Sequence, residues 1–321
     1  MTKVLGKNLA VGMGKESTPQ TGVSPTVWLP LLSKTLNPKV ELAYDMSDWG
    51  HNISSSDSSV VMKYAEPTLR GYVFDNSFGI ILQAIGFQFT NTGSNPYTHT
   101  GAFAETFARN TYSLVAKDAN ETLGFFGAVM NDLEMTFRPR EYCSWSANFK
   151  SLFYATDSET VAWDTDENKF NGTHATVKIA STVAGLSGAT ALTLDGASLK
   201  IDNKLMQHES LGSSNPKGFY AQQVDITGSI DILVSDNTVR DLFAAGTKKA
   251  IEIFLEDTAI DLGGGVHPSL TITLDLATFS GMNEESNNES LRKRTFDFTS
   301  HYDLTNGSAI SCELINSKAS Y

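Results

Sequence analysis

Apolar and polar residues alternate along much of this chain, and this pattern limits the structures that it can form. From residue 224 to residue 234, one parity carries Val224, Ile226, Ile230, Ile232 and Val234, whereas the other carries mostly Asp, Thr and Ser. Successive side chains of a β-strand point to opposite faces, so a segment of this kind buries one face and exposes the other. The pattern predicts a long strand in an antiparallel sheet.

The same alternation recurs in both halves of the chain. It is found in residues 133–137, 143–149, 251–256, 270–277 and 295–299. Helical patterns are few by comparison. The sequence therefore predicts a mainly β fold, built from β-sandwich or barrel modules that each carry one short flanking helix.

Two short segments have the start and stop signals of helices. Residues 75–77 (Asp-Asn-Ser) offer N-caps before an apolar run that stops at Gly86, and residues 236–238 (Asp-Asn-Thr) precede a similar run that stops at Gly246. The two starts are separated by about half of the 321-residue chain. In both halves the expected order is strand, strand, short helix, strand, strand, which predicts a duplicated module.

These elements divide the chain into four parts. Residues 1–38, rich in Gly and Pro, are expected to form an extended arm that docks on a neighbouring subunit. Residues 39–155 are the first predicted β module, residues 156–188 a linker with an opening strand, and residues 189–321 the second module.

Composition narrows the class of protein. The net charge is −12 with a pI near 4.9, which is the opposite of what a phosphate-binding surface requires. Two cysteines, Cys143 and Cys312, are too few and too far apart for a disulfide framework. No segment has the length and apolarity of a signal peptide or a membrane span, so we expect a non-secreted protein without membrane contact.

No recognised catalytic, cofactor or metal motif is complete, and we expect no enzyme activity, no cofactor and no metal. The six histidines are scattered, and no serine lies in Gly-x-Ser-x-Gly. The segment from Gly12 to Ser17 lacks the first glycine of a phosphate loop, because Leu9 stands there. The segment from Asp164 to Lys169 starts like a calcium loop but has lysine at the turn glycine.

Several segments resemble the major tail tube proteins of bacteriophages with long, non-contractile tails. They are residues 5–7 (Leu-Gly-Lys), 12–17 (Gly-Met-Gly-Lys-Glu-Ser), 28–30 (Trp-Leu-Pro), 65–71 (Ala-Glu-Pro-Thr-Leu-Arg-Gly), 85–87 (Ile-Gly-Phe), 127–135 and 225–229. The resemblance spans nearly the whole chain and is one of pattern, without an invariant chemical signature.

The resemblance implies both a fold and a function. Members of this family pack two antiparallel sheets with one helix in each module, and six modules surround a channel wide enough for DNA. Two tandem modules in one chain would make a trimeric, pseudo-hexameric ring, and stacked rings would form the hollow tail of the virion. The implied partners are other copies of the chain, the tape measure, tail terminator and distal tail or baseplate proteins, and double-stranded DNA in passage. Assembly would take place in the host cytoplasm.

Two sets of residues are candidates for this function. Acidic residues on polar strand faces could line the channel and repel the DNA backbone, with solvated outer-face positions as the alternative reading; they are Asp202, Asp225, Asp231 and Asp275. The polar loops 46–59 and 206–219 are candidate ring-stacking elements, with Asp48, Trp49, His51, His208, Glu209 and Asn215 as the residues expected to make contacts.

Three other functions fit a β-rich acidic chain. One is a glycan-binding β-sandwich adhesin or tail fibre component, for which the four tryptophans could supply a platform. Another is the inner tube of a contractile injection system, and a third is a hydrolase on a β scaffold. Only the tube hypotheses predict an open-ended polymer.

Overall fold

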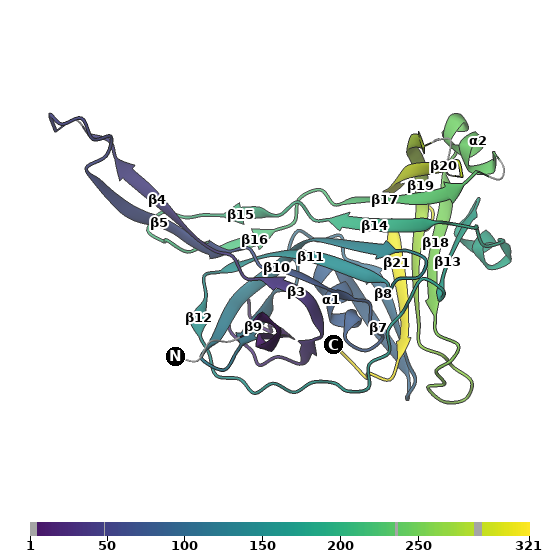
Figure 1. Ribbon diagram of the computed structural model, residues 1–321, viewed down its shortest axis with the longest axis horizontal. Helices are drawn as coiled ribbons and strands as arrows, with labels where there is room; N and C mark the ends of the chain where they lie inside the picture. The colour runs from purple at the N-terminus through teal and green to yellow at the C-terminus, as the bar shows by residue number, and fades with distance from the viewer. Residues whose placement is uncertain (1–4, 48, 235–236, 286–290) are drawn as a thin grey trace.

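The computed structural model describes residues 5–47, 49–234, 237–285 and 291–321. The fold is mainly β, as the alternation predicted (Figure 1). Two long strands, β10 (Thr122–Phe137) and β19 (Ser269–Glu285), each take part in two sheets. The register shifts within each of them, between Met130 and Asp132 and between Phe279 and Gly281, where the strand passes from one set of neighbours to another.

The largest sheet has eight antiparallel strands. Its order is β3–β6–β11–β10–β14–β17–β20–β19. Besides β10 and β19, this sheet contains β3 (Leu31–Thr35), β6 (Thr68–Tyr72), β11 (Ser144–Leu152), β14 (Gly196–Asp202), β17 (Asp225–Leu233) and β20 (Lys293–His301). Along β11 buried and half-buried residues alternate without a break, so one face of the sheet covers the core.

The first halves of the two long strands belong to two outer sheets. One has the order β2–β1–β9–β10–β12, with β2 (Val27–Leu29), β1 (Ala10–Lys15), β9 (Tyr112–Lys117) and β12 (Ala155–Thr156). The other has the order β13–β18–β19–β21–β8–β7, with β13 (Ala175–Ala180), β18 (Lys249–Glu256), β21 (Ile310–Asn316), β8 (Tyr97–Phe103) and β7 (Phe87–Gly93). When the strand pairs of the described residues are followed from one strand to the next, no path comes back to the strand where it began, so the sheets are open.

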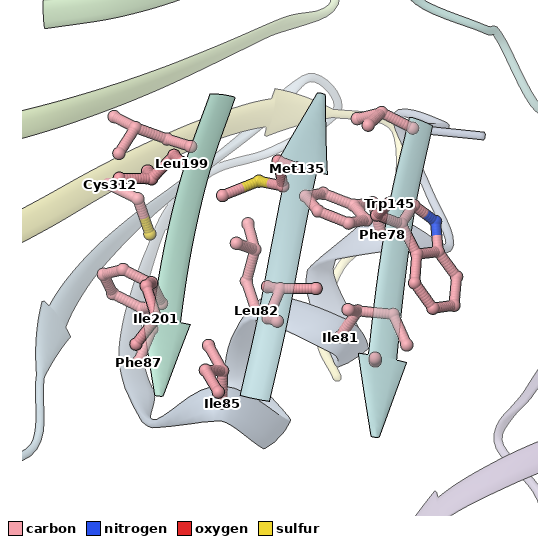
Figure 2. Packing of buried hydrophobic residues seen from close by; sticks show 14 of the residues in the cluster. Phe78, Ile81, Leu82, Ile85, Phe87, Met135, Trp145, Leu199, Ile201 and Cys312 are labelled. Carbon is pink, nitrogen blue, oxygen red and sulfur yellow. The ribbon is translucent and has the colours of Figure 1, made fainter. Parts of the chain in front are cut away.

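Both predicted helices are present. α1 (Phe78–Ile85) ends at Gly86 and α2 (Thr238–Ala245) at Gly246, and both glycines have positive φ (140° and 59°), which other residues rarely adopt. Every residue of α1 is buried beneath the large sheet, and Figure 2 shows Leu82 and Ile85 next to Met135 of β10 and Ile201 of β14. Two short 3-10 segments, Gly6–Asn8 and Val183–Gly188, complete the helical content of the described residues.

Two hairpins lie outside the main sheets. β4 (Pro38–Asp45) and β5 (Asp57–Ala65) form a long ribbon that projects from the body (Figure 1). β15 (Met206–His208) and β16 (Gly218–Tyr220) form a shorter one that lies along the same side. In the sequence, the β4–β5 hairpin lies between β3 and β6, and these two strands pair with each other. The β15–β16 hairpin lies in the same way between the paired strands β14 and β17.

The structure corrects the predicted extended arm at residues 1–38. Residues 10–15 form β1, which pairs with β2 and β9, and Val11 and Met13 are buried in the core. The Glu16 carboxylate is buried as well and accepts hydrogen bonds from the backbone N–H of Gly127 (2.7 Å) and the Ser113 hydroxyl (3.0 Å). A segment with buried strands and a buried, hydrogen-bonded carboxylate belongs to the body of the protein.

Candidate assembly surfaces

The eight-stranded sheet has one face on the core, and none of the strands and helices described here packs over its other face. Strand alternation assigns Thr68, Ser146, Glu134, Thr227 and Thr295 to the open face, opposite the buried residues of the same strands. Acidic side chains outnumber basic ones on this face: Asp132, Glu134, Asp202, Asp225, Asp231, Glu285 and Asp297 against Arg70, Lys150, Lys200 and Lys293. The face is polar and carries a net negative charge.

Three of the four predicted acidic residues lie together on this open face. Asp202 and Asp225 are direct cross-strand neighbours, and Asp231 lies farther along β17. Asp231 accepts a hydrogen bond from the Thr295 hydroxyl (2.6 Å) and lies 3.2 Å from the Lys293 ammonium, which raises the pKa of Lys293. Asp225 is paired with Lys204, and Asp202 lies 4.0 Å from the Lys200 ammonium.

The fourth, Asp275, is not on this face. It lies in the first half of β19, in an outer sheet, and is 6% exposed. Its carboxylate accepts a hydrogen bond from the Ser308 hydroxyl, and burial raises its pKa. The alternation of residues 270–277 located the strand correctly, but one strand's alternation cannot tell which layer covers its polar side.

The β4–β5 hairpin exposes a run of large apolar side chains. Val60 lies opposite Leu42 and shares its face, whereas Val61 is the extra residue at the register shift that follows, and each valine is 45% exposed. Other exposed apolar residues follow the ribbon to its tip: Val40, Leu42, Tyr44, Met46, Trp49 and Ile53. An isolated two-stranded ribbon is marginally stable in water, and a continuous apolar surface of this kind marks a contact with another protein surface.

The predicted stacking residues of the first loop lie at the tip of this ribbon. Trp49 is 70% exposed and His51 is exposed, whereas Asp48 lies outside the described residues. Asp45 ends β4 and accepts hydrogen bonds from Ser47 and from the Ser56 hydroxyl, and these bonds lower the pKa of Asp45 to about 2. The ionised carboxylate therefore ties the two sides of the loop together.

The structure brings the second predicted loop next to the first hairpin. His208, Glu209 and Asn215 are exposed on the β15–β16 hairpin and its loop. The backbone N–H of Lys63 in β5 donates to the carbonyl of Ser214 (2.7 Å). The loop 206–219 thus contacts the ribbon at Lys63, near its base and outside the predicted segment 46–59.

The sequence reasoning missed the apolar residues of the ribbon. Val40 and Leu42 alternate with polar or small residues, and Val60 and Val61 follow a Ser-rich stretch. Such a pattern indicates an apolar strand face, but the sequence alone does not show that this single chain leaves that face uncovered.

Groups that could support catalysis were also considered. Among the described residues no three His, Cys, Asp or Glu side chains gather as metal ligands, and no helix is long and apolar enough to cross a membrane. Burial raises the pKa of the Cys143 thiol to about 12 and also raises that of Cys312, so both are unreactive apolar core residues. Burial raises the pKa of Glu167 to about 7, and this carboxyl accepts a hydrogen bond from the Ser77 N–H (3.2 Å) at the start of α1.

The sequence matches a family model described as phage tail tube protein over residues 6–300, which is nearly the whole chain. The chain belongs to the phage tail tube protein family. No curated protein matches it. Membership makes this tube protein a structural component of the virion tail. Open sheet edges and an exposed apolar ribbon favour association with other protein surfaces.

Proposed function

We propose that this protein is the repeating subunit of the phage tail tube and polymerises as stacked rings. Each chain supplies two tandem modules, the first ending near residue 155 and the second starting near residue 189, so three chains form a pseudo-hexameric ring. The repeated order of strand pairing supports this division: β1–β9–β10 with β6–β11–β10 in one half, and β13–β18–β19 with β17–β20–β19 in the other.

The exposed apolar surface of the ribbon carries this proposal. Val60 and Val61 are exposed on β5, and Trp49 and Ile53 extend the apolar surface to the tip. In the tube, the ribbon lies against the next ring or a neighbouring chain, together with the β15–β16 hairpin. Covering these side chains gives the hydrophobic driving force for association.

The open polar face of the large sheet is proposed to line the channel. Its excess of carboxylates repels the phosphate backbone, so double-stranded DNA passes through without adsorbing. The family also implies contacts with the tape measure, tail terminator and distal tail proteins, and assembly in the host cytoplasm. None of these roles requires a catalytic group.

Electron microscopy of the purified protein over a concentration series tests the proposal. Hollow tubes, or rings with threefold or pseudo-sixfold outlines, are expected as the concentration rises. A protein that stays monomeric at every concentration contradicts self-assembly and favours the glycan-binding alternative, which saturable sugar binding would then establish. Tubes that form only within a contracting sheath would favour the injection-system alternative.

A further inference from the structure

The large sheet ends in two edges that have no partner strand among the described residues. At one edge, β3 pairs only with β6. At the other edge, residues 281–285 of β19 pair only with β20. Unpaired strand edges of this length readily pair with another chain.

The two halves of the sheet repeat one pattern of pairing. β3–β6–β11–β10 and β14–β17–β20–β19 are both antiparallel, and their third and fourth strands form hairpins. The one-residue register shift at Asn131 in β10 corresponds to the shift at Ser280 in β19. Likewise Ser33 lies opposite Arg70, as Gly196 lies opposite Asp231. Residue positions in the two halves can therefore be matched one to one.

The two halves join inside the chain through one strand pair, β10 with β14. In this junction Glu134 lies opposite Lys200, and Asp132 lies opposite Asp202. The backbone N–H of Asn203 donates to the carbonyl of Asn131 (2.7 Å). The edge of the first half is thus completed by the first strand of the second half, while the matching edge of the second half, in β19, stays open.

α2 is less buried than α1, as expected if the sheet above α2 lacks one strand at its open edge. α1 is wholly buried because β14 extends the sheet above it, with Leu199 and Ile201 over its end (Figure 2). In α2, the corresponding helix of the second half, only Val239 is buried, and Leu242 and Phe243 remain half-exposed. Met282, which corresponds to the buried Leu133, is 39% exposed. A strand from another molecule would cover these apolar groups.

From these observations we propose that the β19 edge pairs antiparallel with residues 35–39 of a second copy of this chain, in the register of the internal β10–β14 junction. Transferring that register places Asn283 opposite Asn37 of the partner subunit, Gly281 opposite Lys39 of the partner subunit and Glu285 opposite Thr35 of the partner subunit. The inference rests on the proposed self-assembly and assigns its edges and register.

In this register the outward backbone groups of residues 36–38 meet the β19 edge, with one donor missing at Pro38. The Asn37 carbonyl accepts from the Glu66 N–H (3.1 Å), so the backbone groups of Leu36 and Pro38 face outward. Pro38 takes the place that Ile201 has in the internal junction, so the ladder lacks one N–H donor there and retains the Pro38 carbonyl and both backbone groups of Leu36. On the other edge Gly281 has no side chain, so the ammonium of Lys39 from the partner subunit can reach Asp297, which lies opposite Gly281 on β20.

Cysteine pairs test the register directly. Positions 37 and 283 form a pair without direct backbone hydrogen bonds, where side chains of opposing strands are closest and a disulfide fits. The Asn37→Cys/Asn283→Cys variant is assembled under reducing conditions and then oxidised. We expect chains linked up to covalent trimers, at least about fivefold more than in an Asn37→Cys/Glu285→Cys variant, whose pair is two residues out of register.

Matched variants separate the possible results. The Glu134→Cys/Lys200→Cys variant places the same pair at the internal junction and should link within one chain. Thr35→Cys/Glu285→Cys is a second in-register pair, and each single variant should give no ladder of linked chains.

If assemblies form but neither in-register pair links, or if the out-of-register pair links better, the register is wrong while the proposed function stands. If the single variants assemble and both in-register variants fail to, the edge pairing is also overturned. If the wild-type chain never assembles, the proposed function itself fails.

Discussion

The buried carboxyl of Glu167 gives the protein a pH-dependent stability at the scale of one residue. Its Oε2 accepts from the Ser77 N–H (3.2 Å), its Oε1 is buried without a hydrogen-bond partner, and burial is the main cause of its raised pKa of about 7. Above about pH 4.5 the unfolded chain releases this proton, while the folded chain keeps it until about pH 7. Folding stability therefore falls as pH rises through this window.

Replacing Glu167 with Gln removes this titration. The variant should be more stable than the wild type at pH 8 by about 2 kcal/mol and nearly equal at pH 4, because Gln stays neutral at both values. Urea unfolding of the unassembled protein at both pH values measures the difference. Asp166→Asn, at an exposed neighbouring carboxylate, is the control and should change neither value; an equal gain in both variants would assign the effect to net charge.

Asn203, in the second half of the chain, forms buried hydrogen bonds with residues of the first half. It is fully buried, donates to the carbonyls of Ile85 (2.9 Å) and Met130 (3.0 Å), and accepts from the Arg109 guanidinium (3.0 and 3.2 Å). Asn203→Ala leaves a buried cation and two carbonyls without these partners, so it should cost roughly 2–4 kcal/mol of unfolding free energy. Asn215→Ala, in an exposed loop, should stay within about 0.5 kcal/mol in the same urea titration.

At the scale of elements, the proposed role of the projecting ribbon in assembly can be tested separately from folding. Trp49 and Ile53 are 70% and 72% exposed, so their loss should leave the unfolding midpoint of the monomer unchanged. The Trp49→Ser/Ile53→Ser variant should raise the protein concentration needed for tubes at least about tenfold, since each tenfold corresponds to about 1.4 kcal/mol of lost contact. Light scattering against concentration gives this threshold. Leu304→Ser, at a residue exposed to 90%, is the matched control; an unchanged threshold in the ribbon variant would remove the ribbon from the contact.

Some of the strands and helices could be predicted from the sequence, and others could not. The strand around Ile230 and the helix that ends at Gly86 were predictable because period-two alternation and cap residues are local signals. β1 was missed since Gly12 and Gly14 interrupt its apolar pattern; each lies against another segment, Gly12 against Pro25 and Trp28 and Gly14 against Ser24. The burial of Asp275 depends on Ser308, distant in sequence, and only the fold brings the two together.

At the scale of the whole molecule, the proposed position of the sheet's polar face in the channel can be tested through its charge. Glu134 and Asp225 are exposed on this face, on strands from the two halves of the chain. Changing both to Lys alters the charge by four units per chain, so the repulsive wall becomes attractive to phosphate. Tubes of the Glu134→Lys/Asp225→Lys variant should retain short double-stranded DNA at low salt and release it as salt rises, because bound phosphates exchange with counterions.

Co-sedimentation of labelled DNA with assembled tubes measures this retention, and wild-type tubes should retain almost none. A Glu121→Lys/Asp166→Lys variant carries the same charge change at exposed positions off the large sheet. Retention by the sheet variant alone, with protection of the DNA from added nuclease, places the polar face inside the tube. Equal retention by both variants, or DNA that nuclease removes freely, would mean that the acidic face lies on the outer surface and that another face lines the channel.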